Sequence, residues 1–339
     1  MKYPEENYAR DLHNQLSSIF KPVMPGTAVS ITGRGVHWDV TAEFGSRLCK
    51  IHCFDVRGPE YLISFQQSSQ EVAMGRTPSN EDAIAAVTAW LEGKELSDLH
   101  ARFQFVDGQK RALENIRARV FAHCPELQQA LVAEMQHKAC DLYELWFRAG
   151  DRSCRIYYYG KNEFPDAIFN WDECPNFSFK TGDLRQLALV LSRWLSARVM
   201  PSDLCKEFPW IELRKVAEFY EQGRGIEGEF VESWDNIERF YAEMNFPLAE
   251  EIRQLVSEMR RCGYDHNLRA GQSMYTLIVS RSRRHGLRKG QPHISFQFRQ
   301  EGMDVQTEIQ GAETVSIPRI GLTKEIEDRL NRLAAETVT

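Results

Sequence analysis

The stretch WLEGKELSDLHARFQFVDGQKRA, residues 90–112, recurs as WLSARVMPSDLCKEFPWIELRKVA, residues 194–217. The shared Ser-Asp-Leu tripeptides begin at Ser97 and Ser202, an offset of 105 residues. The same offset relates three further identities: Phe103 and Phe208, Lys110 and Lys215, and Ala112 and Ala217. The offset of the Trp-Leu pair, at Trp90 and Trp194, is one residue shorter. Each Trp-Leu pair ends an apolar segment of helical pattern. Identities that recur in constant order indicate an internal duplication.

A second correspondence links the middle of the chain to its end. Leu131-Val132-x-Glu134-Met135 matches Leu255-Val256-x-Glu258-Met259, and Arg148-Ala149-Gly150 matches Arg269-Ala270-Gly271. The offsets are 124 and 121, so a short deletion would separate the two matches. This correspondence predicts a third copy of the repeated unit.

Hydrophobic periodicity predicts the same order of elements in each copy: a helix, three or four antiparallel strands, and a second helix. For the first copy the expected elements are a helix at Tyr8–Phe20, strands at Val36–Phe44, Leu48–Val56 and Tyr61–Gln67, and a helix capped by Ser79. For the second copy they are a helix at Glu126–His137, strands at Asp141–Arg148, Cys154–Tyr159, Ala167–Trp171 and Phe177–Lys180, a helix capped by Thr181, and a further helix at Ile211–Glu221. For the third copy they are a helix at Leu248–Arg261, strands at Tyr275–Arg281, His293–Arg299 and Asp304–Ile309, and a helix capped by Thr323.

The connections between the predicted strands are short, which favours hairpins over parallel crossovers. The expected fold class is therefore α+β, built from repeated helix–antiparallel sheet–helix units, two of them clear and the third less so. We expect domains at residues 1–122, 123–228 and 229–339. The second would end in a glycine-rich linker, Glu221–Gly228, and another boundary is expected near Ala122–Pro125.

The composition is that of a globular protein: 339 residues, 42% hydrophobic and 27% charged, with a net charge of −6. The amino terminus has no apolar segment typical of a secretory signal, and no window is apolar enough to span a membrane. Eight cysteines occur without any Cys-x-x-Cys pair, which favours buried free thiols in a reducing compartment. We expect a cytoplasmic protein without membrane association.

No catalytic motif stands out from the sequence. Gly223–Gly228 matches Gly-x-Gly-x-x-Gly, but a dinucleotide site needs that motif between a strand and a helix, and here it follows a predicted helix. No cofactor is therefore expected. Carboxylates of the second copy could form a metal-dependent phosphodiesterase or nuclease site, although the Glu-x-Lys that usually follows is missing: Glu144, Asp151, Asp166, Asp172 and Glu173.

Aromatic side chains gather in the second copy: Tyr157, Tyr158, Tyr159, Phe164, Phe169, Trp171, Phe177 and Phe179. Alternate residues of a strand face opposite sides of its sheet, so Tyr158 faces away from Tyr157 and Tyr159. Core and interdomain packing would explain most of these residues. The alternative is a sheet face that binds a partner, with Tyr158 and Trp171 as candidate contacts.

One basic segment has no counterpart elsewhere in the chain. Residues 266–300 include no acidic residue and seven basic ones. Five of the seven lie in a predicted turn between two strands: Arg281, Arg283, Arg284, Arg288 and Lys289. Arginine binds phosphate well because its planar guanidinium donates two parallel hydrogen bonds, so this hairpin is a candidate nucleic-acid contact. Residues 226–251, with eight acids and one arginine, could instead neutralise it within the fold or across a dimer, or the loop could be solvated and inert.

The order helix, three strands, helix resembles that of double-stranded RNA-binding domains, as does Gly290-Gln291-Pro292-His293 near the second strand of the third copy. In that family the first hairpin loop and the start of the last helix contact the duplex. The last helix here begins Thr323-Lys324-Glu325-Ile326-Glu327-Asp328, which is acidic where that family is rich in lysine. The chain is not assigned to the family.

These features favour a non-catalytic interaction protein. Its basic hairpin would contact a polyanion such as nucleic acid or an acidic partner surface, and a protein partner or self-association is expected. The alternative is the metal-dependent phosphodiesterase.

Overall fold

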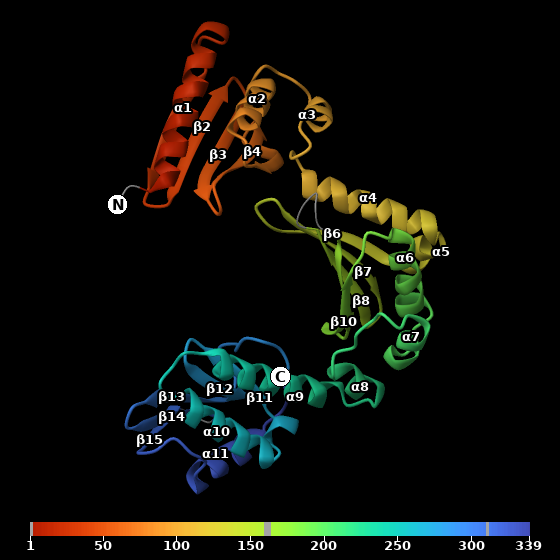
Figure 1. The fold of residues 1–339 in the computed structure, drawn as a ribbon, viewed down its shortest axis with the longest axis vertical. Helices are drawn as coiled ribbons and strands as arrows, with labels where there is room; N and C mark the ends of the chain where they lie inside the picture. The colour runs from red at the N-terminus through yellow and green to blue at the C-terminus, as the bar shows by residue number, and fades with distance from the viewer. Residues whose placement is uncertain (1–2, 159–163, 310–311) are drawn as a thin grey trace. The chain divides into compact units, whose positions relative to one another are not determined.

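The computed structural model describes residues 3–158, 164–309 and 312–339, and these residues form an α+β fold with three five-stranded antiparallel sheets (Figure 1). In each sheet, consecutive strands are hydrogen-bonded neighbours, so each is a simple meander. One helix precedes each meander and another follows it. The predicted repeat is confirmed, with five strands per copy rather than three or four, and each copy is called a module below.

The first module has the order α1 (Pro4–Val23), β1 (Ala28–Arg34), β2 (His37–Phe44), β3 (Arg47–Asp55), β4 (Pro59–Gln67), β5 (Gln70–Thr77) and α2 (Asn80–Leu91). Leu12, Leu16 and Phe20 recur every fourth residue of α1 and are buried in the core. Alternate residues of the central strands meet them there, as expected for a sheet covered on one face. Ser79 caps α2 as predicted, because its hydroxyl accepts a hydrogen bond from the Asp82 amide at 3.1 Å.

The repeated Ser-Asp-Leu segments form equivalent short helices, α3 (Leu96–Arg102) and α7 (Pro201–Glu207). The segment after each helix then forms a single antiparallel bridge with the last strand of its meander. Val106 bridges Gly75 in β5, and Leu213 bridges Phe177 in the last strand of the second sheet. The duplication therefore extends beyond the modules to the segments that follow them.

The second module has the order α4 (Gly108–His123), α5 (Glu126–Ala130), β6 (Val132–Ala139), β7 (Leu142–Ala149), β8 (Arg152–Tyr157), β9 (Asp166–Trp171), β10 (Cys174–Lys180) and α6 (Leu184–Leu191), which continues into a π-helical turn at Ser192–Ser196. The predicted helix at Glu126–His137 is wrong beyond Ala130. Val132–Ala139 is rich in helix-forming residues, but its pairing with β7 overrides that local preference.

The predicted cap of α6 is also wrong. Asp183 caps this helix, because its carboxylate accepts hydrogen bonds from the amides of Arg185 and Gln186 at 2.9 and 3.2 Å. Thr181 instead accepts a hydrogen bond from the Asp183 amide at 3.0 Å. The threonine thus orients the capping residue. Tyr159, placed at the end of a predicted strand, lies outside the described residues.

The third module contains α9 (Gly225–Glu243), α10 (Ala249–Arg261), β11 (Arg269–Ser273), β12 (Thr276–Ser280), β13 (His293–Arg299), β14 (Gly302–Glu308), β15 (Ala312–Ile317) and α11 (Lys324–Ala334). Thr323 caps α11 as predicted. The sequence match of residues 131–135 with 255–259 is wrong as a structural equivalence, because the first segment lies mainly in β6 and the second in α10. The third copy is nevertheless present, as its own helix–sheet–helix order shows.

The glycine-rich segment 221–228 is not a flexible linker. Helix α8 (Val216–Glu221) ends there and α9 begins at Gly225, so two of its glycines are helical. A Cβ atom at Gly228 would lie 2.5 Å from the Cβ of Phe219, and these glycines therefore allow α8 and α9 to pack closely. The predicted helix over Ile211–Glu221 begins only at Val216, because the preceding residues form the bridge to β10.

We expect Gly228→Ala to lower the free energy of unfolding by about 1–3 kcal/mol, because the added methyl group overpacks the contact with Phe219. Alanine's higher helix propensity, about 1 kcal/mol, offsets part of this loss. Gly108→Ala is the matched control, since nothing lies within 4 Å of a Cβ at that first position of α4. Urea denaturation of both variants tests the expectation, and an equal response would contradict it.

Contacts divide the chain into two compact units: residues 1–149, 154–167 and 180–192 form unit 1, and residues 150–153, 168–179 and 193–339 form unit 2. The three-domain division at residues 122/123 and 228/229 stays a prediction. Among the described residues, no helix combines the length and apolar character needed to cross a membrane.

Candidate functional site

The predicted basic turn is the loop 281–292, which joins β12 to β13. It has two distinct parts. Arg281, Arg283 and Arg284 are partly buried at its start, whereas Arg288 and Lys289 are exposed further along. The five candidate residues therefore do not form one uniform basic surface.

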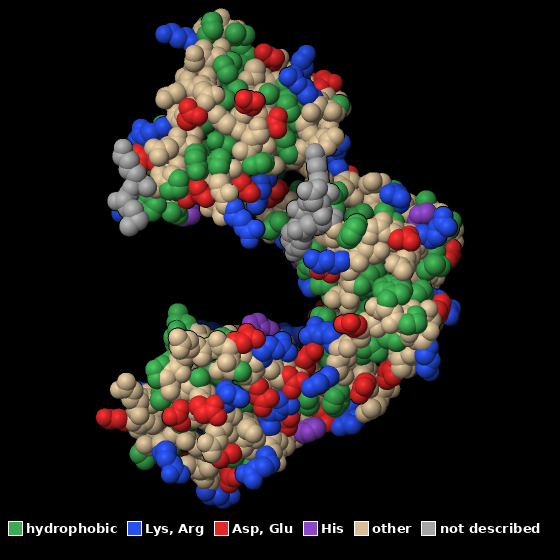
Figure 2. Space-filling view, in the orientation of Figure 1, with side chains coloured by type: hydrophobic (Ala, Val, Ile, Leu, Met, Phe, Trp, Pro, Cys, Tyr) green, Lys and Arg blue, Asp and Glu red, His purple; other side chains and the backbone are tan. Residues whose placement is uncertain are grey.

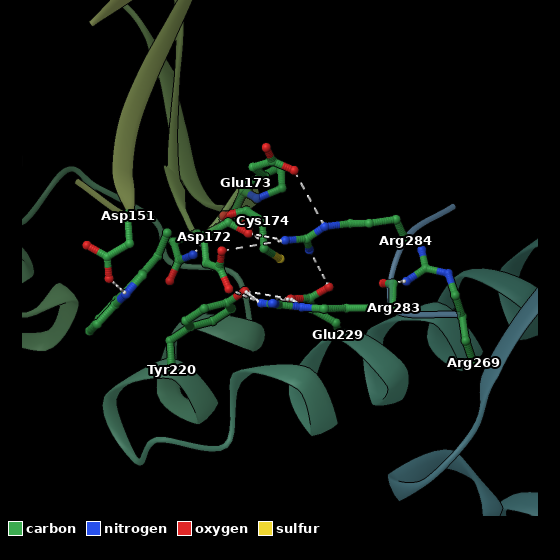
Figure 3. Close-up of polar contacts among 12 residues, drawn as sticks. Asp151, Asp172, Glu173, Cys174, Tyr220, Glu229, Arg269, Arg283 and Arg284 are labelled. Carbon is green, nitrogen blue, oxygen red and sulfur yellow. Dashed lines mark hydrogen bonds and ion pairs between the residues drawn. The ribbon is translucent and has the colours of Figure 1, made fainter. Parts of the chain in front are cut away.

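Glu229 of α9 is the centre of the contacts that hold the start of the loop (Figure 3). Its side chain is only 4% exposed. One carboxylate oxygen accepts from Arg283 Nη2 at 3.0 Å and from the Tyr220 hydroxyl at 2.6 Å, and the other accepts from Arg284 Nη1 at 2.6 Å. A buried carboxylate is thus matched by two guanidinium groups and a hydroxyl.

The same arginines contact the turn between β9 and β10. Arg283 forms an ion pair with the Asp172 carboxylate, and Arg284 donates to the Asp172 backbone carbonyl (Figure 3). Asp172 and Glu173 both have positive φ, 49° and 65°, as in the two-residue hairpin turns that match the twist of a sheet. Both residues are non-glycine, so the turn is conformationally unfavourable and the arginine contacts stabilise it.

The protonation of the cluster follows from these contacts. Burial tends to lower the pKa of Arg283, but Asp172, Glu229 and Tyr220 together raise it above its ordinary value. Burial, with the hydrogen bond to Glu229, raises the pKa of Tyr220. The arginine is therefore charged and the tyrosine neutral at physiological pH, which maintains the hydrogen bonds described above.

Residues near the carboxyl-terminal end of the sequence pair with the start of the loop. The Arg283 amide donates to the Thr339 carbonyl at 2.9 Å, and the Thr339 amide donates to the Arg281 carbonyl at 3.2 Å. Arg281 also donates from Nε to the Glu336 carbonyl at 2.8 Å. Backbone and side chains together fix this part of the loop.

The acidic residues 226–251 have other cationic partners besides the loop. Arg260 of α10 pairs with Asp235 at 2.8 Å and with Glu238 at 2.7 Å, and Lys215 pairs with Asp235 at 2.9 Å. Figure 2 shows acidic and basic side chains interspersed over the region of α9 and α10. Internal pairing, one of the alternatives drawn from the sequence, therefore describes Arg283 and Arg284 but not Arg288 and Lys289.

Trp171, a candidate contact residue, is half-buried in a clamp around Arg152. The Arg152 guanidinium carbon lies 4.2 Å from the ring centres of both Trp171 and Trp194. Its Nη1 donates to the carbonyls of Trp194 and Val199 at 3.2 and 2.7 Å. The Trp171 indole donates to Asp151 at 2.9 Å. Trp171 thus lies within a packed group of side chains.

Tyr158, the other aromatic candidate, lines a cavity of about 1230 Å³ in compact unit 1. The Tyr158 carbonyl accepts from Gln109 at 2.7 Å, and Gln109 accepts from the Tyr143 amide at 2.6 Å. Arg102 at the end of α3 and Phe103 after it also line this cavity. The two aromatic candidates therefore have different surroundings.

Most of the carboxylates proposed for a phosphodiesterase site are paired with cations, each with a different one. Asp151 pairs with Arg198 at 2.5 Å, Glu144 pairs with Lys138 at 3.1 Å, and Asp172 pairs with Arg283. In the part of the chain that the structure describes, no three His, Cys, Asp or Glu side chains are grouped so that they could hold a metal ion. The phosphodiesterase alternative stays a prediction.

A comparison with protein families finds no matching family model, and a comparison with curated proteins finds no significant match.

Proposed function

We propose that the chain is a non-catalytic interaction protein whose loop 281–292 contacts an anionic partner, either a nucleic acid or an acidic protein surface. One observation supports this most directly: the loop is held by Arg283 and Arg284, while Arg288 and Lys289 remain exposed. The loop thus combines a fixed base with a cationic end.

A fixed base favours binding because less conformational entropy is lost when the partner binds. The exposed end is itself a turn, since the Arg288 amide donates to the Gln291 side chain at 2.9 Å and the Gln291 amide donates to the Arg288 carbonyl at 3.1 Å. Leu287, 38% exposed, adds an apolar contact beside the two cations. No ion pair or side-chain hydrogen bond holds the Arg288 or Lys289 side chain among the described residues.

We expect Arg288→Ala/Lys289→Ala to weaken binding of a labelled polyanion about tenfold at 50 mM salt, because two cationic contacts are lost. Its thermal stability should be that of the wild type, since both side chains are exposed. Fluorescence anisotropy would measure the affinity of the full chain for labelled single- and double-stranded DNA and RNA and for polyglutamate. Measurements at about 50 and 200 mM salt would give the salt dependence.

Arg253→Ala/Arg261→Ala is the matched control, because it removes two exposed cations from α10 of the same module. This control should bind as the wild type does. The proposal is contradicted if none of the labelled polyanions binds at 50 mM salt, or if the loop variant and the control bind equally well. Which probe loses affinity in the loop variant would distinguish a nucleic acid from an acidic protein surface.

A further inference from the structure

One face of the second sheet carries an aromatic and cationic surface. Helix α4 packs on the other face, where Phe121 contacts the buried Phe147 of β7. Alternation along β7 and β8 places the neighbouring residues on the face away from α4. We call these residues the open face: Lys138, Trp146, Arg148, Arg155 and Tyr157, all in compact unit 1.

The arginines of the open face stack on its aromatic rings. The Arg148 guanidinium carbon lies 4.0 Å from the Trp146 ring centre. The Arg155 guanidinium carbon lies 5.4 Å from the Trp146 ring centre and 4.8 Å from that of Tyr157. Cation–π contacts at these distances hold the guanidinium groups against the sheet.

The hydrogen-bond donors of these two arginines have no partner in the part of the chain that the structure describes. Over the described residues, neither the Arg148 nor the Arg155 side chain forms a hydrogen bond or an ion pair, and Arg155 Nε is buried without an acceptor. This contrasts with Arg283 and Arg284, whose donors meet carboxylates. Two oriented guanidinium groups therefore have donors available for an external anion.

The acidic groups beside the open face do not cancel its positive charge. Glu144 is buried, and it accepts from the Trp146 indole at 2.9 Å and pairs with Lys138 at 3.1 Å. Burial tends to raise the pKa of Glu144, but hydrogen bonds from Tyr157, Trp146 and Lys138 together lower it. Glu134, opposite Trp146 on the edge strand β6, is a second acid of this face. Asp166 of β9 is a third, because it alternates with the buried Ala167 and Phe169. Lys180 of β10 lies on the same side, because it alternates with Phe179, which stacks on the buried Phe169. The four cations of this side of the sheet therefore outnumber its three acids by one.

The geometry points to single-stranded nucleic acid as the ligand of the open face. The guanidinium edges would donate to phosphate oxygens, and their planes, supported by Trp146 and Tyr157, would stack with bases. A double helix keeps its bases inside and offers only phosphates. An acidic peptide would use the arginine edges but has no use for the stacking surface. This site shares no residue with loop 281–292, and the inference does not depend on the proposed function of that loop.

The test uses the full chain carrying Arg288→Ala/Lys289→Ala, so that the remaining binding does not come from the loop. The probes are labelled oligo-dT and oligo-U of about 15 nucleotides, a DNA duplex of equal length, and labelled polyglutamate. To this background we would add Arg148→Ala/Arg155→Ala. The matched control adds Arg119→Ala/Arg185→Ala, which removes two exposed arginines from α4 and α6.

We expect the single strands to bind more tightly than the duplex or polyglutamate. The open-face variant should lose at least tenfold in affinity, and the slope of log K against log salt should become shallower by about 1.4, since two phosphate contacts are lost. The control should keep the affinity. Binding should also quench tryptophan fluorescence in the parent protein, and Trp146→Phe should reduce this quenching because its indole supports the stacked base.

Three results would overturn the inference: no single-strand binding at 50 mM salt, equal affinities of the open-face variant and the control, or quenching that is unchanged by Trp146→Phe. Polyglutamate that binds more tightly than the single strands and depends on Arg148 and Arg155 would replace the nucleic acid with an acidic peptide. Circular dichroism would show whether the open-face variant is folded, so that its affinity can be compared with that of the parent protein.

Discussion

Glu229→Gln should lower the free energy of unfolding of compact unit 2 by about 3 kcal/mol. The substitution keeps the volume of the side chain but removes the charge that pairs with two guanidinium groups in a nearly buried site. Removing one partner of a buried ion pair costs about 3–5 kcal/mol, because the remaining charge stays desolvated without compensation. Arg283 and Arg284 are partly exposed, which places the expected loss at the lower end of that range.

Urea denaturation followed by circular dichroism measures this loss. Glu232→Gln on the same helix is the control, because it breaks a more exposed pair with Arg214 and should cost less than about 1 kcal/mol. Hydrogen exchange adds a local test: amides of loop 281–292 should exchange faster in Glu229→Gln than in Glu232→Gln. If the two variants are equally stable and exchange equally, Glu229 does not anchor the loop.

Arg152→Ala should also destabilise compact unit 2 by about 3 kcal/mol. Arg152 is 2% exposed between two tryptophan rings, so truncation leaves a cavity and removes a desolvated cation–π contact. The carbonyls of Trp194 and Val199 also lose their donor. Burial lowers the pKa of Arg152 to about 10. The charged guanidinium is therefore costly to bury, and its removal in Arg152→Ala offsets part of the loss of stability.

Arg152→Lys distinguishes shape from charge. A lysine keeps the positive charge but lacks the planar group that stacks between two rings and donates to two carbonyls. We expect it to recover less than half of the stability that Arg152→Ala loses. Arg193→Ala, which breaks an exposed pair with Glu207, should have little effect in the same thermal and urea measurements. A lysine variant as stable as the wild type would show that charge alone is required.

The sequence predicts central strands better than edge strands. Strands β2, β3 and β4 are evident because alternate residues are buried and apolar. The sequence does not predict five strands, and each of them lies at the edge of its sheet: β1, β5, β6, β11 and β15. Most residues of β1 and β6 are exposed, and the alternation in β1 is limited to Val29 and Ile31, so the apolar pattern is weak. The acidic helix α9 was also not evident, because glycines mark its first turn and its close packing on α8 is a tertiary feature.

For the candidate site, the sequence indicates the basic loop but not the residues that contact it. The sequence around Arg283 and Arg284 contains no acidic residue, and this local feature indicates the loop. Their partners are not visible locally, because Asp172 and Glu229 are 112 and 55 residues from Arg284. Nothing in the periodicity of the chain indicates which of many carboxylates meets which arginine, so only the fold could show that the loop has a fixed base and an exposed end.

The internal duplication does indicate the buried Arg152, because an arginine recurs at the equivalent position, 105 residues earlier. Residues 45–51, GSRLCKI, align with residues 150–156, GDRSCRI, at that offset. Arg47 and Arg152 occupy equivalent places: Arg47 donates to the carbonyls of Trp90 and Lys94 at 2.9 and 2.5 Å, and its guanidinium carbon lies 4.1 Å from the Trp90 ring centre. The conserved spacing of Arg47 and Arg152 within the duplicated segments therefore indicates an equivalent structural role for the two arginines.

The single-residue bridges that follow α3 and α7 determine where a further strand could extend the first two sheets. An unpaired edge strand can template the addition of another chain. Val106 and Leu213 occupy the edges at β5 and β10, and the chain then continues toward the helices α4 and α8. Strand addition to these two sheets is thereby directed to the opposite edges, β1 and β6. Aggregation and β-augmentation by a partner peptide would compete there for the same backbone groups.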